Sequence, residues 1–213
     1  MKSVGLFVFL ACIAGLYAIQ LKCAHQELNI PNEWIDMHKE CVHKMRGQVE
    51  EELKASMQYM AMGAHFSKDT INRPGFADLF FDAASEEREH AIKLIHYLLM
   101  RGELTSNLSE LIKRNLVPSV TTWDNGVSAL KQALQLEASV TRKIRDVTKV
   151  CEEAESFNDY HLVDYLAGDF LGEQYHGQRD LAGKVSDLQK MMAEHGALGE
   201  WLFDKKLQNK AIV

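Results

Sequence analysis

The stretch FADLFFDAASEEREHAIKLIHYLL, residues 76–99, contains a long apolar stripe that two polar residues interrupt. Apolar side chains recur there every three or four positions, as one face of an α-helix requires. Glu87 and His90 occupy two steps of the same rhythm, so we expect both to face the interior. A carboxylate buried alone is costly or shifts its pKa, whereas a bound cation removes both problems. The spacing Glu-x-x-His is also the one that di-iron carboxylate bundles use.

A single Glu-x-x-His pair is a weak signal, because a core histidine paired with a neighbouring glutamate gives the same pattern. Three further stretches, near residues 42–63, 130–147 and 166–185, show the same apolar rhythm. Each carries one metal-capable polar residue near its middle: Glu52, Glu137 and Gln174. One shared internal site explains these interruptions better than several independent accidents.

The four apolar stripes, with only 3 Pro in 213 residues, predict one all-α domain built as a bundle of long helices. Asn32 would cap the first helix, and Pro74 suits the start of the second, where its missing N–H costs nothing. We expect the helices near residues 32–67, 74–101, 122–153 and 157–192, followed by a short fifth helix near 198–203.

The connection between the predicted second and third helices, residues 102–121, is unusually long for a compact domain. Such a length is explained if the chain must travel from one end of the bundle to the other. We therefore predict that the second and third helices run parallel.

Residues 1–18 have the features of a secretory signal segment, in which Lys2 precedes an apolar run that ends at Ala18. The run is shorter than the roughly 20 residues of a membrane-spanning helix, although an N-terminal anchor is the alternative. We expect cleavage, an irregular extension over 19–32, and a helical domain over 33–213 without membrane contact. The protein would enter the secretory pathway and be secreted, or stay in the ER or Golgi lumen.

Secretory entry permits disulfides, and cleavage after Ala18 leaves three cysteines: Cys23, Cys41 and Cys151. Cleavage after Ala24 is the alternative, and it would also remove Cys23. If the second and third helices are parallel, Cys41 and Cys151 lie at the same end of the bundle and can pair. Cys23 would then be free to reach another subunit. A local Cys23–Cys41 bond and three free thiols are the alternatives. The sequon at Asn107 is a candidate glycosylation site in the predicted connection.

The predicted ligand set suits iron, because a zinc site would favour more His or Cys. One metal position would use Glu52, Glu87 and His90. The other would share Glu87 and add Glu137 and Gln174, since the fourth helix offers Gln-Tyr-His-Gly instead of a second Glu-x-x-His. Such an asymmetric pair favours iron as a substrate that passes through rather than as a fixed prosthetic group.

The sequences ELKAS at 52–56, EEREHA at 86–91 and LFDK at 202–205 closely resemble the ferritin heavy-chain family. The match covers about residues 33–207, and the signal segment with Cys23 and Cys41 is similar to secreted insect-type heavy chains. The resemblance implies a ferritin-like four-helix bundle with a long crossover between helices two and three and a short fifth helix. It further implies a hollow shell of 24 subunits, mixed with a ferritin light chain, that stores ferric mineral.

The same resemblance implies a ferroxidase centre that oxidises Fe(II) with O2. Glu52, Glu87 and His90 would bind the first iron, and Glu87, Glu137 and Gln174 the second. Tyr59 would be the phenol that hydrogen-bonds the site.

Two further roles follow from the resemblance, and both depart from the family pattern. The threefold iron channel would use Asp164, but the Glu expected three residues later is Ala167, so His161 would supply part of the route. Only Glu86 and Glu89 match the family's acids for mineral nucleation, and a solvated charged face is an equal explanation for each.

Other functional classes fit less well. The net charge of −6, with no Gly-rich phosphate loop or basic patch, argues against nucleic-acid partners. A catalytically silent structural subunit would lack ligands that are intact here. A di-iron oxygenase or reductase with a fixed centre would need the missing second Glu-x-x-His, and a lipid-binding bundle would tolerate no polar residues in its apolar stripes.

Overall fold

The computed structural model describes residues 31–104, 111–153 and 158–210. Several predictions concern residues outside these ranges. They are the predictions on the signal segment, Cys23, the rest of the extension before residue 31 and the Asn107 sequon. Within the described residues no strand occurs, and no helix has both the length and the apolar character that crossing a bilayer requires.

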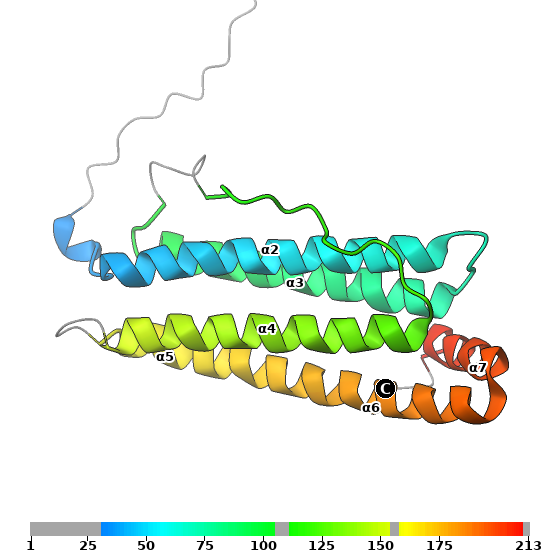
Figure 1. Ribbon diagram of the computed structural model, residues 1–213. Helices are drawn as coiled ribbons and strands as arrows, with labels where there is room; N and C mark the ends of the chain where they lie inside the picture. The colour runs from blue at the N-terminus through cyan, green and yellow to red at the C-terminus, as the bar shows by residue number, and fades with distance from the viewer. Residues whose placement is uncertain (1–30, 105–110, 154–157, 211–213) are drawn as a thin grey trace, which may run out of the picture. The chain divides into compact units, whose positions relative to one another are not determined.

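Four long rods form the helical unit, as Figure 1 shows. Helices α2 (Lys39–Ser67) and α3 (Pro74–Met100) form one antiparallel pair. Helix α4 (Gly126–Glu153) pairs with a rod made of α5 (Tyr160–Tyr165), the π-helical segment η3 (Leu166–Leu171) and α6 (Gly172–His195). The short helix α7 (Ala197–Gln208) packs at one end, against α3 and α6. The predicted all-α bundle with a fifth short helix is confirmed.

The predicted start of the first helix is wrong. Asn32 begins only a 3-10 turn, η1 (Asn32–Trp34), and α2 starts at Lys39 with His38 as its N-cap. Tertiary contacts hold the segment between them: the Trp34 indole donates to the Met100 carbonyl (3.1 Å), and Arg101 donates to Asp36 (2.6 Å). These contacts with the end of α3 replace the capped helix that local propensity favoured.

The fourth rod is not a uniform α-helix. Its buried residues Leu162, Leu166, Phe170 and Gln174 are all four positions apart. Four residues of α-helix turn about 400°, so such a stripe would drift around the rod. The wider turn of a π-helix offsets that drift, and η3 lies where the offset is needed. The stripe therefore stays directed at the bundle interior.

The described part of the crossover before α4, residues 111–125, runs along the bundle, and α3 and α4 are parallel, as predicted (Figure 1). Two buried side chains of α2 hold it in place. Gln58 donates to the Val120 carbonyl (2.7 Å) and accepts from the Ser119 amide (3.1 Å). Glu50 accepts from the amide of Arg114 (3.1 Å) and pairs with its guanidinium (3.0 Å).

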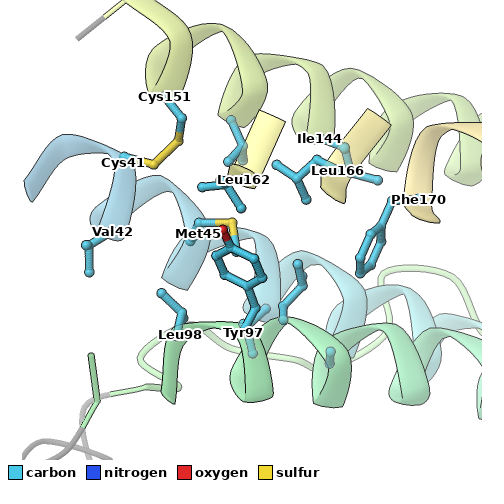
Figure 2. Close-up of a cluster of buried hydrophobic side chains, with 14 of the residues drawn as sticks. Cys41, Val42, Met45, Tyr97, Leu98, Ile144, Cys151, Leu162, Leu166 and Phe170 are labelled. Carbon is cyan, nitrogen blue, oxygen red and sulfur yellow. A yellow bond between two sulfur atoms is a disulfide. The ribbon is translucent and has the colours of Figure 1, made fainter. Parts of the chain in front are cut away.

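Two apolar clusters fill the interior, one toward each end. Figure 2 shows part of the first, where Cys41 and Cys151 form a buried disulfide with Cα atoms 4.9 Å apart. The parallel arrangement of α3 and α4 predicted that pairing. The second cluster contains stacked phenylalanines from α3 and α7, Phe76 and Phe203 among them. Between the clusters each long rod presents buried polar side chains.

Candidate metal centre

Five predicted ligand residues and Tyr59 are buried in the middle of the bundle. They lie where the two apolar clusters meet; Glu87, for example, lies between Ala84 of one cluster and Ala91 of the other. The exposed fractions are at most 8% for the whole group, which consists of Glu52, Tyr59, Glu87, His90, Glu137 and Gln174. Four separate rods contribute to it, so the group exists only in the folded bundle.

Three of these residues converge most closely. One ligand atom from each of Glu52, Glu87 and His90 lies within 4.8 Å of the others. Glu52 Oε2, Glu87 Oε2 and His90 Nδ1 are buried, and none has a hydrogen-bond partner among the described residues. Glu52 Oε1 is already engaged, because it accepts from Gln48 (2.9 Å). Three unpaired ligand atoms facing one another are costly unless a cation binds them, so the donor set fits a divalent metal ion.

The opposite half of the centre is more fully hydrogen-bonded. The Tyr59 hydroxyl donates to Glu137 Oε1 across the bundle. Gln174 Oε1 accepts from the Thr141 hydroxyl (2.8 Å), which leaves it less free to act as a ligand. The two halves are therefore unequal, one with unpaired carboxylate and imidazole atoms and one with a neutral, partly engaged amide.

Burial and nearby like charges raise the pKa values of three side chains in the centre. Burial, reinforced by the charge of Glu87, raises the pKa of Glu52 well above its usual value. Burial and the neighbouring Glu137 do the same for the pKa of Glu87. The pKa of Tyr59 is also raised, by burial and then by Glu137. Protons therefore compete more strongly than usual with a cation for these carboxyl groups.

A cavity of about 270 Å³ adjoins the centre and reaches the protein surface. Its inner wall includes Tyr59, Glu87, His90 and Gln174. Exposed carboxylates line its outer part: Asp82, Glu86, Glu173 and Asp180. The cavity offers a route for small cations, and its charge would raise their local concentration.

Sequence reasoning missed three of those outer carboxylates. Glu173 is the most informative, since its Oε2 lies 3.2 Å from His90 Nε2 and 3.8 Å from Lys93 Nζ. It is off the apolar stripe, next to Gln174, so no periodicity marks it. Asp82 and Asp180 lie on exposed helix faces, which give no sequence signal either.

The predicted nucleation and channel residues lie apart from the cavity, with one exception. Glu86 lines its outer part, whereas Glu89 is exposed on α3 and does not contribute to the cavity wall. Asp164 and His161 are exposed on α5 and line none of it. His161 Nδ1 lies 2.8 Å from the Tyr97 hydroxyl, so that nitrogen is already engaged.

Comparison with known proteins gives one consistent family. The family model of the ferritin-like domain matches residues 43–191. The ferritin heavy chain of Trichoplusia ni is 59% identical over 203 residues, covering 93% of this chain and 96% of the relative. The Papilio xuthus ferritin heavy chain is 58% identical over 208 residues, covering 97% and 98%. The crystal structure of Trichoplusia ni secreted ferritin matches with a TM-score of 0.84 and 61% identity, over 88% of this chain and 98% of that one.

Proposed function

This chain belongs to the ferritin family, and on that basis we propose that its buried cluster is the Fe(II)-oxidising centre of an iron-storage protein. The observation that carries the proposal is the set of three unpaired, buried ligand atoms on Glu52, Glu87 and His90. Iron enters as substrate, loses an electron and leaves as Fe(III).

The two proposed iron positions have unequal sets of ligands. Glu52, Glu87 and His90 would hold the first Fe(II), and their unpaired atoms support that role. Glu87 would bridge to the second Fe(II), with Glu137 and Gln174 as weaker partners. Tyr59 keeps Glu137 oriented through its hydrogen bond. Because the second position is weakly held, product release is favoured over retention of a fixed centre.

The chemistry needs two held Fe(II) ions and a small oxidant. Each Fe(II) gives up one electron, and O2 accepts them together with protons. The two electrons from one filled centre, together with two protons, reduce one O2 to one H2O2. Fe(II) binding competes with protons for the buried carboxyls, because these groups bind a metal in their deprotonated form.

The proposal also covers the assembly of the protein into a shell and its secretion. Ferritins form oligomeric shells, and we infer that this chain builds a shell of 24 subunits with a ferritin light chain. The match to a secreted ferritin, together with the signal-like residues 1–18, supports secretion. Glu86 at the cavity mouth and the exposed Glu89 would help nucleate mineral.

The deciding experiment combines Glu87→Ala with His90→Ala and follows Fe(II) oxidation in air by stopped flow. We expect the fast phase to vanish while the shell still assembles, because removing buried charged groups that lack partners need not cost stability. Glu194→Ala with His195→Ala is the matched control, since that neighbouring Glu–His pair on α6 is exposed. Wild-type rates in the first variant would reject the centre.

The channel role is tested separately with Asp164→Asn. Copies of Asp164 around a threefold axis would attract Fe(II), so we expect slower uptake at low salt with unchanged oxidation once iron is bound. Unchanged uptake at low salt would assign the route to other residues.

A further inference from the structure

We propose that Glu173 is a positioning residue for His90, whose Nε2–H it accepts so that Nδ1 remains the metal-binding nitrogen. The inference rests on the proposed function, because it takes His90 as an iron ligand.

The two ring nitrogens of His90 have different surroundings. Nδ1 faces the buried cluster, lies 3.6 Å from Glu87 Oε2 and has no hydrogen-bond partner among the described residues. Nε2 lies on the other side of the ring, 3.2 Å from Glu173 Oε2. A neutral imidazole carries one N–H, and only its other nitrogen can bind a metal.

Glu87 alone would favour the wrong tautomer. Its carboxylate attracts an N–H on Nδ1, which would block the nitrogen that must bind iron. A second carboxylate on the far side of the ring competes for that proton and holds it on Nε2. Metal-binding histidines commonly donate their other N–H to such a partner, which also fixes the ring orientation.

The helical rod explains why this partner is available. Glu173 lies in the first turn of α6, directly after the π-helical segment, next to the buried Gln174. Neighbouring residues of a helix point about 100° apart, so the pair approaches the cavity from two directions. Lys93 Nζ lies 3.8 Å from Glu173 Oε2 and helps to hold that carboxylate in place. The ring centroids of Phe170 and His90 are 5.5 Å apart.

Two other roles for Glu173 give different results on substitution. As a direct metal ligand or a charge that attracts cations, it would need its negative charge. As a positioning residue, it needs only an acceptor oxygen at the same place. Glu173→Gln keeps that oxygen and removes the charge, and Glu173→Ala removes both.

The experiment uses assembled shells and anaerobic Co(II), followed by calorimetry and by the visible absorption bands of the bound ion. We expect Glu173→Ala to lower the Co(II) affinity of the site that includes His90 roughly 10-fold. The absorption bands should also change, because nitrogen coordination is lost. Glu173→Gln should stay within about twofold of wild type, with wild-type bands. Asp187→Ala, an exposed acid on the same helix, is the matched control.

A double-mutant cycle isolates the route through His90. Glu173→Ala should have no further effect in a His90→Ala background. The proposal is overturned if Glu173→Gln lowers the Co(II) affinity as much as Glu173→Ala does. It is equally overturned if Glu173→Ala still lowers the affinity in the His90→Ala background. It is also overturned if Glu173→Ala keeps wild-type affinity and bands. Undiminished Co(II) binding after Glu87→Ala with His90→Ala would instead reject the proposed centre itself.

Discussion

Tyr59 on α2 donates its hydroxyl to the Glu137 carboxylate on α4, and this hydrogen bond crosses the centre of the bundle. It links two residues that are 78 positions apart in sequence, in the layer where the polar side chains gather. The bond engages one carboxylate oxygen of Glu137.

Tyr59→Phe should slow Fe(II) oxidation while leaving the bundle folded. The phenyl ring fills the same buried volume, but Glu137 loses a charge-assisted hydrogen bond worth about 1.5 kcal/mol or more. We expect the fast phase to fall roughly 10-fold in stopped flow. Tyr175→Phe, an exposed tyrosine on α6, should match wild type. An unchanged rate in Tyr59→Phe would show that Glu137 needs no such orientation.

Metal binding at the centre should weaken as the pH falls. The pKa values of Glu52 and Glu87 are raised, so protons compete more strongly with a divalent ion for these carboxyls as the pH falls. Each displaced proton lowers the apparent affinity by up to about tenfold per pH unit. Co(II) calorimetry between pH 7.5 and 6 measures the slope, and Glu52→Gln should make it shallower. Affinity that is independent of pH would contradict the assignment.

Without metal, the same shifts act on stability in a defined direction. Above the ordinary carboxyl pKa of 4.5, the unfolded chain releases protons that the folded chain still holds at Glu87. The metal-free bundle therefore loses stability as the pH rises from that value. Glu87→Gln should remove part of this loss and raise the Tm of metal-free protein more at pH 7 than at pH 5.

Breaking the disulfide should lower stability without touching the oxidation chemistry. The bond closes a loop of 110 residues, and the chain-entropy model assigns about 5 kcal/mol to a loop of that length. Cys41→Ser with Cys151→Ser should lower the Tm clearly by calorimetry. Because the disulfide lies at one end of the bundle and the polar centre in its middle, the rate of Fe(II) oxidation should be retained. A variant that kept its Tm but lost oxidation would contradict this separation.

Gly75→Ala should weaken the packing of α7 on α3. A Cβ at this position would lie 2.0 Å from the Asp204 carbonyl oxygen and 2.8 Å from the Gln208 amide nitrogen. Backbone atoms cannot move aside as a side chain can, so we expect a loss of about 3 kcal/mol. Gly183→Ala is the control, because no atom lies within 4 Å of its Cβ and the helix should gain slightly. Equal Tm changes in the two variants would show that α7 tolerates displacement.

The sequence by itself determined the number and order of the long helices and the polar layer inside them. Both follow from periodicity, since a residue such as Glu87 on an apolar stripe must face the interior wherever the helix packs. The length of the connection before α4 likewise required parallel helices, and from that the approach of Cys41 to Cys151 could be predicted.

Only the tertiary structure decided the features that depend on contacts between elements. Asn32 failed to start a helix because Trp34 and Asp36 bond to the end of α3 instead. The sequence did not predict the π-helical segment, because it depends on how the buried stripe of the fourth rod packs against the three neighbouring rods. Glu173 carries no periodic signal, and its approach to His90 arises from how α6 meets α3. Local patterns fix which face of a helix is buried, whereas the partner of each exposed or off-stripe residue is set by packing between helices.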